Sequence, residues 1–129
     1  MITVNKMSLI TNQVLLTNNF LPQGNFEAIP HFTKKIEKNN NSNNEYMVEL
    51  QVKFIDEPEN RFPINLTVKL SGIFEIKHDN DDELNTFLNT NAIQILYPYL
   101  RTMVSTITAS ALFPSINLPL IGPDAFKTE

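Results

Sequence analysis

Residues 91–126 read NAIQILYPYLRTMVSTITASALFPSINLPLIGPDAF, and the first part of this stretch has the spacing of an amphipathic helix. Its apolar side chains recur every three or four residues, which places them on one side of a helix. They are Leu96, Leu100, Met103, Val104, Ile107 and Ala111. Proline is tolerated in the first turn of a helix, so we expect Pro98 near the start and Phe113-Pro114 just beyond the end. The sequence therefore predicts a helix over residues 98–111.

The other sides of this predicted helix carry almost no charge. Beyond Arg101 they hold small, neutral residues: Thr102, Ser105, Thr106, Thr108, Ala109 and Ser110. A helix whose polar side faces water normally carries several charged residues. Small neutral side chains instead allow a second protein surface to approach closely. We therefore expect the helix to build a homo-oligomer, and the alternative is a monomer whose Ser/Thr side is solvated.

Two runs before the helix alternate between apolar and polar residues, as strands with one wet face do. The first run, residues 46–55, directs Tyr46, Val48, Leu50, Val52 and Phe54 inward and Glu49, Gln51 and Lys53 outward. The second run, residues 64–76, directs Ile64, Leu66, Val68, Leu70, Gly72, Phe74 and Ile76 inward. The turn-forming residues 56–60 between the runs predict an antiparallel hairpin. Ser71-Gly72 predicts a bend or bulge within the second strand.

Residues 8–21 and 31–38 are weaker strand candidates, and residues 78–90 are interpreted as a polar connection between the sheet and the helix. Strands first and a helix last predict the α+β class, with an antiparallel sheet and one helix laid against a face of it. A chain of 129 residues is long enough for one core, so we expect a single domain over residues 1–129.

Composition excludes several classes of function. The net charge of −4 argues against nucleic-acid binding, because phosphate contacts need a basic patch. The absence of cysteine excludes disulfides and thiolate chemistry. The N-terminal residues are too polar for a secretory signal, and no apolar run approaches the ~20 residues of a membrane-spanning helix. We expect a cytoplasmic protein that does not insert into membranes.

The motifs of catalytic and metal sites are missing. The two histidines, His31 and His78, are far apart in the sequence, whereas zinc needs three or four convergent ligands. Residues 79–83 are acidic like a calcium loop, but Leu84 and Thr90 stand where that loop requires glycine and glutamate. The glycines do not cluster into a phosphate-binding loop. We therefore expect no enzyme activity, no metal and no cofactor.

Several short motifs resemble the SecB family of protein-export chaperones. The family has a helix start Ile-Leu-Phe-Pro-Tyr-Ala-Arg and an exit Phe-Pro-x-Leu-x-Leu. The matching residues are Ile95-Leu96-Tyr97-Pro98-Tyr99-Leu100-Arg101 and Phe113-Pro114-Ser115-Ile116-Asn117-Leu118. The strand start at Tyr46 resembles the family's Tyr-Glu-Val, and Gly72-Ile73-Phe74 resembles its Gly-Ile-Phe. The motifs follow in family order over residues 46–126.

The resemblance implies a four-stranded antiparallel sheet with one long C-terminal helix, and a homotetramer built as a dimer of dimers. The family's second helix is expected to be missing, because the sequence ends at Glu129. The implied oligomer interface comprises Arg101, Thr102, Ser105, Thr106 and Ala109. The implied groove for unfolded clients comprises Leu84, Phe87, Leu88, Ile93, Tyr97 and Phe113.

SecB proteins also dock a translocase ATPase on an exposed acidic face of the sheet. The family positions that present a leucine and a glutamate there fall on Asn65 and Thr67, both on the wet face of the predicted strand. Because the acidic contact is lost, a basic partner loses its countercharge. We expect weak or no binding of that ATPase.

Three functions stay open from the sequence. The first is a general ATP-independent holdase that binds unfolded or precursor polypeptides and is linked to protein export. The second is a dedicated chaperone of an antitoxin in a toxin–antitoxin system, which the lost acidic contact favours. The third is an oligomeric scaffold of SecB type that has no client.

Overall fold

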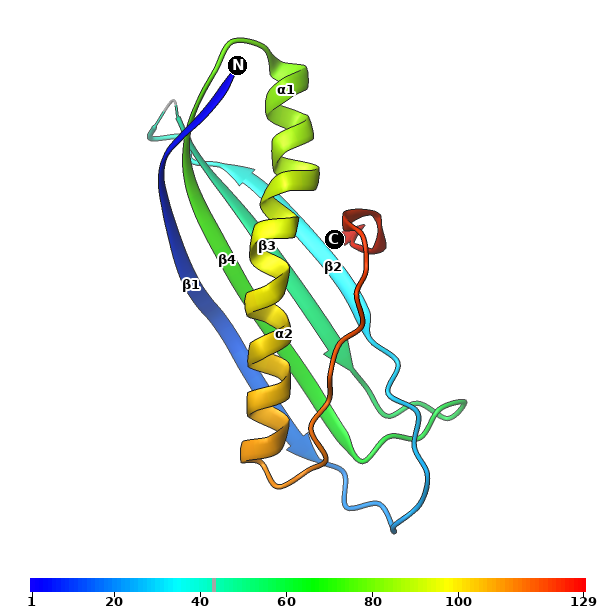
Figure 1. The fold of residues 1–129 in the computed structure, drawn as a ribbon. Coiled ribbons are helices and arrows are strands. Elements are labelled where there is room, and N and C mark those ends of the chain that lie inside the picture. The colour runs from blue at the N-terminus through cyan, green and yellow to red at the C-terminus, as the bar shows by residue number, and fades with distance from the viewer. Residues whose placement is uncertain (43) are drawn as a thin grey trace.

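The computed structural model of the chain describes residues 1–42 and 44–129. Its elements are β1 (Ile2–Asn18), β2 (His31–Lys38), β3 (Glu45–Phe54), β4 (Ile64–His78), α1 (Asp81–Thr86), the π-helical turn η1 (Phe87–Asn91), α2 (Ala92–Ser110), the 3-10 turn η2 (Pro123–Ala125) and β5 (Lys127–Thr128). The strands form one sheet, and the helical stretch from α1 to α2 lies lengthwise across one face of it (Figure 1). The α+β class predicted from the sequence is confirmed.

The sheet has five strands in the order β1-β4-β3-β2-β5. The four long strands pair antiparallel, and the short strand β5 pairs parallel to β2. The predicted sheet of four antiparallel strands is therefore corrected to a mixed sheet, whose fifth strand has 2 residues. Strand β2 has the predicted bounds, whereas β1 begins and ends earlier than the predicted residues 8–21.

The hairpin β3–β4 has the predicted alternation. Leu50 lies opposite Leu70, and Val52 lies opposite Val68. All the apolar residues predicted to face inward on these strands are buried. Besides Ser71, which is 1% exposed, the exception on the outer face is Gln51, which is only 5% exposed. Its side-chain amide donates a hydrogen bond to Thr33 Oγ1 on β2, at 3.1 Å.

The predicted bend at Ser71-Gly72 is wrong, because the register of β4 with both neighbouring strands runs through these residues without a shift. Gly72 has a packing role instead. A Cβ atom at this position would lie 2.7 Å from a ring carbon of Phe74 and 2.8 Å from Leu96 Cδ2. These distances are shorter than van der Waals contacts allow, so the glycine lets α2 approach β4 closely.

The irregularities of the sheet lie in β1, where the pairing shifts between Val4 and Lys6 and again between Thr11 and Gln13. Each shift moves the inward-facing residues to the other parity of the sequence. Judged by their partners on β4, the residues on the helix side are Ile2, Val4, Met7, Leu9, Thr11, Val14 and Leu16. A strand with two such shifts has no continuous period-two pattern, which explains its weak signal in the sequence.

The helical stretch begins well before the predicted start. Asn80 caps α1, because its Oδ1 accepts the N–H of Glu83 at 2.8 Å. The stretch interpreted as a polar connection is thus mostly helical, and η1 joins α1 to α2 without a break. Pro98 consequently lies inside α2 rather than in its first turn. The predicted end is correct, since α2 ends at Ser110.

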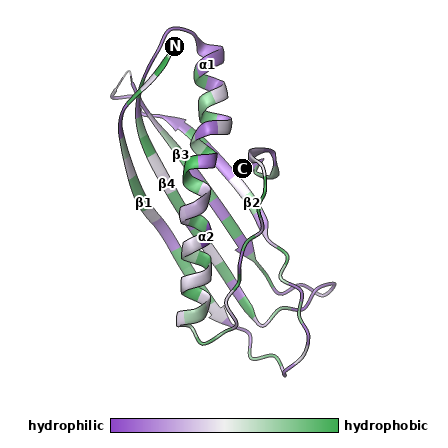
Figure 2. Ribbon diagram, in the orientation of Figure 1, coloured by the Kyte–Doolittle hydropathy of each residue, from purple (hydrophilic) through white to green (hydrophobic). Residues whose placement is uncertain are grey.

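The core lies between the helical stretch and strands β3 and β4. Leu96, Leu100 and Val104 of α2 are 0% exposed. Figure 2 shows the strands as alternating apolar and polar bands, and α1 as largely hydrophilic on its visible side. Within the described part of the chain, no helix combines the length and the apolar character needed to cross a membrane.

Candidate functional site

A cavity of about 1100 Å³ lies at the end of the molecule where α2 terminates. Three segments that are far apart in the sequence line it, and none of the lining residues is charged. They are Leu21, Pro22, Gln23, Gly24, Asn25, Phe26 and Ala28 from the β1–β2 connection; Phe62, Pro63 and Ile64 at the start of β4; and Phe113, Pro114, Ser115, Ile116 and Asn117 after α2. Such an apolar hollow with a few polar groups has the composition of a ligand-binding site.

The wall after α2 is tied to the last turns of the helix. The N–H of Phe113 donates to the carbonyl of Thr108 at 3.0 Å. The hydroxyl of Thr108 accepts the N–H of Ile116 at 3.0 Å, and Ser115 Oγ donates to the carbonyl of Ser105 at 3.1 Å. The first of these bonds satisfies a carbonyl that the helix end leaves free. Together, the bonds hold the segment from Phe113 to Ile116 beside the helix.

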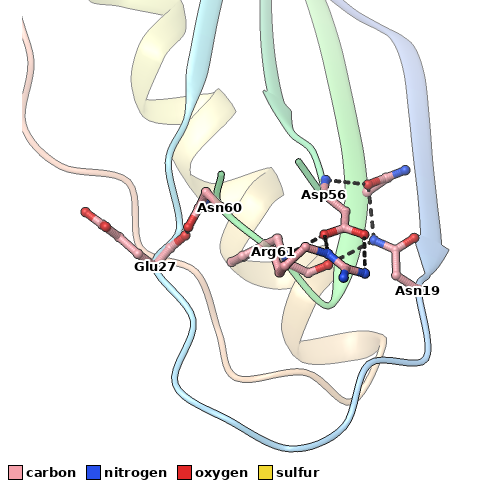
Figure 3. A network of polar contacts seen from close by, with 7 residues as sticks. Asn19, Glu27, Asp56, Asn60 and Arg61 are labelled. Carbon is pink, nitrogen blue, oxygen red and sulfur yellow. Dashed lines mark hydrogen bonds and ion pairs between the residues drawn. The ribbon is translucent and has the colours of Figure 1, made fainter. Parts of the chain in front are cut away.

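A polar network joins the end of β1 to the β3–β4 turn (Figure 3). Arg61 binds both carboxylate oxygens of Asp56, with Nε–Oδ1 at 2.7 Å and Nη2–Oδ2 at 3.1 Å. This contact, with the N–H of Phe62 donating to Oδ1, holds the pKa of Asp56 below its ordinary value. Asn19 Nδ2 donates to the carbonyl of Phe62 at 3.0 Å and to Asn65 Oδ1 at 3.1 Å. The network therefore positions Phe62, a residue of the cavity wall.

The same region holds the β1–β2 connection in place. Asn60 Nδ2 donates to the carbonyl of Glu27 at 3.1 Å (Figure 3). Glu27 lies between Phe26 and Ala28, both of which line the cavity. The sequence reasoning missed this wall, because nothing in the pattern of residues 21–28 indicates which turn they contact.

The six residues assigned to the client groove do not lie together. Leu84, Leu88, Ile93 and Tyr97 are buried in the chain's own core, with exposed fractions of 7, 3, 1 and 7%. Phe87 is half-buried and meets Phe74 edge-on, with ring centroids 5.7 Å apart. It lines a second, smaller hollow near the N-terminus, together with Ile2, Val4, Asn80, Asp82, Glu83, Thr86 and Asn91. Only Phe113 of the six lines the larger cavity.

The residues assigned to the oligomer interface divide into two groups. Arg101 faces the chain's own C-terminal segment, where its Nε donates to the carbonyl of Leu118 at 3.1 Å. Ser105 is half-buried beside the same segment, whereas Thr102, Thr106 and Ala109 are exposed. Thr108, which the sequence placed on the neutral outer side, is 0% exposed. Its side was misassigned because Ile116 of the C-terminal segment bonds to it. Figure 1 shows this segment running back beside α2.

Two aromatic residues anchor this C-terminal segment. Phe126 is 3% exposed and lies between Phe32 of β2 and Tyr97 of α2, with ring centroids 5.0 and 5.9 Å away. Tyr97 Oη donates to the carbonyl of Pro119 at 2.6 Å. Burial raises the pKa of Tyr97, so the hydroxyl keeps its proton and its donor role at neutral pH.

The opposite side of α2 is uncovered. Ile95, Tyr99, Thr102 and Thr106 are exposed and lie three or four residues apart, so they form one uncharged stripe. Beside it, the helix-side residues Val4, Met7, Leu9 and Val14 of β1 are 39, 42, 42 and 44% exposed. We call these eight residues the β1–α2 face. Much of the visible side of α2 is pale in Figure 2, which marks near-neutral hydropathy.

Asn65 and Thr67 lie on the outer face of β4, as the alternation predicts. The side chain of Asn65 is not free for a partner, because its Oδ1 accepts bonds from Asn19 and from the N–H of Asp56. Neither residue is acidic. The outer face thus offers no carboxylate at these two positions.

Comparison with known sequences identifies the family. The family described as preprotein translocase subunit SecB matches residues 16–126. An uncharacterized protein of Methanocaldococcus jannaschii is 40% identical over 60 residues, which are 46% of this chain and 39% of that protein. Protein-export protein SecB 2 of Polaromonas naphthalenivorans is 43% identical over 61 residues, 47% of this chain and 38% of the relative. Protein-export protein SecB of Alcanivorax borkumensis is 32% identical over 87 residues, 66% of this chain and 55% of the relative.

The fold also has a counterpart among solved structures. A SecB-like chaperone of Mycobacterium tuberculosis, in complex with a peptide from the HigA1 antitoxin, superposes with a TM-score of 0.72. The match covers 94% of this chain and 91% of that protein at 13% identity. At this identity the superposition shows only that the folds are similar. Membership of the family follows from the sequence match over residues 16–126. The chain belongs to the SecB family.

Proposed function

We propose that this chain is an ATP-independent chaperone that holds non-native polypeptides in the cavity beside the end of α2. The observation that carries the proposal is the uncharged lining of that cavity, whose volume is about 1100 Å³. Burial of apolar side chains is favourable by ~25 cal/mol per Å² and needs no sequence motif. A client can therefore bind and leave by mass action, without a nucleotide cycle.

The family supports this role. SecB-named relatives are described as protein-export proteins, although the aligned segments cover only 38% and 55% of their lengths. Chaperones of this kind are not enzymes, which agrees with the absence of catalytic motifs in the sequence. We centre the client site on Phe113, Phe26 and Phe62, and assign Leu84, Leu88, Ile93 and Tyr97 to the core. We expect the protein to act in the cytoplasm.

We further propose that the chain assembles through the β1–α2 face into a homotetramer, a dimer of dimers. Four exposed apolar residues of β1 and an uncharged helix stripe lie side by side there. Contiguous apolar surface of this kind is typical of protein–protein interfaces. Of the predicted interface residues, Thr102 and Thr106 belong to this face, whereas Arg101 serves the chain's own C-terminal segment.

A dedicated role as chaperone of an antitoxin is the second candidate function. It is favoured by the outer sheet face, where Asn65 and Thr67 replace the expected apolar and acidic contacts and Asn65 is bonded within the chain. If the chain docks only weakly to a translocase ATPase, a role in export is disfavoured, and the cavity would instead bind one specialised client.

The proposal is tested by light scattering of citrate synthase as it aggregates on heating. We expect the wild-type protein to suppress aggregation stoichiometrically without nucleotide. Phe26→Ser should weaken protection, because Phe26 lines the cavity and is already 37% exposed, so the fold tolerates the change. Leu120→Ala is the matched control, since Leu120 is 85% exposed and lies outside the cavity lining. A wild-type protein without any protective effect would favour a scaffold that has no client.

A further inference from the structure

Two large apolar residues have a backbone conformation that such residues rarely adopt. Phe20 has φ of 52° and Leu112 has φ of 66°, and they are the non-glycine residues with positive φ in the described ranges 1–42 and 44–129. In this left-handed region the side chain crowds the backbone, which is why glycine is the usual occupant. Strain of this kind in a folded protein is often related to function.

Both side chains also point into solvent. Phe20 is 85% exposed and Leu112 is 93% exposed. Glycine would remove the crowding and the exposed apolar surface at the same time. Neither side chain therefore stabilises the isolated chain, and their presence is better explained by a contact with another molecule.

Hydrogen bonds fix how these side chains are presented. The N–H of Phe20 donates to Asn18 Oδ1 at 2.7 Å, and the neighbouring N–H of Asn19 donates to the carbonyl of Pro63 at 2.8 Å. The N–H of Leu112 donates to the carbonyl of Ala109 at 3.1 Å. The backbone at both positions is thus held in place.

The two residues do not line the cavity themselves, but each adjoins a segment that does. Phe20 directly precedes Leu21, and Leu112 directly precedes Phe113, and both of these neighbours line it. The ends of β1 and α2 lie at the same end of the molecule (Figure 1). Phe20 and Leu112 therefore adjoin the uncharged lining from two different segments of the chain.

We propose that Phe20 and Leu112 are client-contact residues, which contact the apolar side chains of an extended polypeptide where it leaves the cavity. This inference rests on the proposed chaperone function and adds two residues to the same site. The occupant is a non-native polypeptide segment with apolar residues beyond those that fill the cavity, because both residues are apolar, exposed and joined directly to residues of the uncharged lining.

The double variant Phe20→Gly/Leu112→Gly tests the inference without endangering the fold, since glycine accepts the positive φ at both positions. The probe is fluorescein-labelled, reduced and carboxymethylated α-lactalbumin, which stays unfolded, and binding is followed by fluorescence anisotropy. We expect the melting temperature to stay equal or rise, and the Kd to increase by about tenfold. The control Leu120→Ala should leave the Kd unchanged, because Leu120 is equally exposed but does not adjoin the cavity.

The possible results separate the two proposals. If the wild type binds the probe, Phe26→Ser weakens binding and the double variant binds like the wild type, the role of Phe20 and Leu112 is wrong while the cavity function stands. If the double variant has a lower mass in light scattering than the wild type, the two residues contact another copy of the chain, and the inference is also wrong. If the wild type does not bind the probe at all, both proposals fail.

Discussion

Strands β1 and β4 pair along almost their whole lengths, yet they differ in how they are covered. The inward residues of β4 lie beneath α2 and are between 0 and 3% exposed, from Ile64 to Ile76. The inward residues of β1 lie beside the helix rather than beneath it, and Met7, Leu9 and Val14 remain 42 to 44% exposed. One helix covers only about the width of two strands. The hairpin β3–β4 is therefore covered within the chain, whereas the described residues cover the helix side of β1 only in part.

The largest expected effect contrasts the two regions directly. Leu100→Ala should lower the free energy of unfolding by about 3 kcal/mol, since it leaves a cavity among fully buried residues. Leu9→Ala removes the same atoms from a side chain that is 42% exposed and should cost clearly less at a concentration where the chain is monomeric. Urea denaturation measures both values. Equal losses would show that β1 is covered within the chain, contrary to our description.

The closeness of α2 to β4 can be tested at Gly72. Gly72→Ala should lower the free energy of unfolding by about 2 kcal/mol, because the added methyl group overlaps Phe74 and Leu96. Gly72→Ala should cost less when it is introduced into the Leu96→Ala variant, because that variant lacks one of the two overlapping groups. Thermal unfolding is a suitable measurement. A neutral Gly72→Ala variant would contradict tight packing of helix on sheet.

The mass of the protein in solution tests whether another copy of the chain covers the exposed side of β1. Thr106→Lys should split the assembly and lower its mass toward the 14.7 kDa of one chain, because the substitution places an unpaired charge in the β1–α2 face. Gln94→Lys is the matched control: Gln94 is also exposed, but it shares a side of α2 with Arg101 and not with Thr106. Light scattering at micromolar concentration gives the mass. A wild-type protein that is itself monomeric would refute the proposed oligomer.

The smallest expected effect concerns the polar link between β1 and the hairpin. The pKa of Asp56 is lower in the folded protein than its ordinary value of 3.8. The carboxylate therefore stabilises the fold at and above that pH, and the contribution is lost as the pH falls through the folded pKa. Asp56→Asn should make stability less dependent on pH below about pH 4 while changing the melting temperature slightly at pH 7. Melting curves between pH 2 and pH 7 measure this. Parallel curves for wild type and variant would argue against the role of Asp56.

The elements that were predicted well are those whose burial is periodic. Strands β3 and β4 keep one parity throughout, so the alternation of Tyr46 to Phe54 and of Ile64 to Ile76 was enough to identify the hairpin and its inward face. The stripe Leu96, Leu100 and Val104 identified α2 for the same reason. Each pattern reflects a single neighbouring layer that buries one side of an element.

The start of the helix was missed because local signals opposed the packing. Asparagines and acidic residues dominate residues 79–91, and Pro98 is a common first-turn residue. The apolar residues Leu84 and Leu88 continue the stripe upstream, but their burial comes from packing against the core of the folded chain. They were assigned to a client groove because an apolar residue in a polar segment needs some cover, and the sequence does not show whether the chain's own core or a client supplies it.

The periodic pattern of the sequence predicted the hairpin, the α+β class and the long helix with its uncharged stripe. Each of these depends on residues a few positions apart and on one adjoining layer that buries one side of the element. The cavity did not follow from any such pattern. Its walls come from residues 21–28, 62–64 and 113–117, which meet only because β1 pairs with β4 in one register and Asn19, Asp56 and Asn65 join the strand ends. The left-handed conformation of Phe20 and Leu112 likewise depends on hydrogen bonds that the folded chain supplies. Contacts between distant segments are set by three-dimensional packing, and a single sequence carries no periodic trace of them.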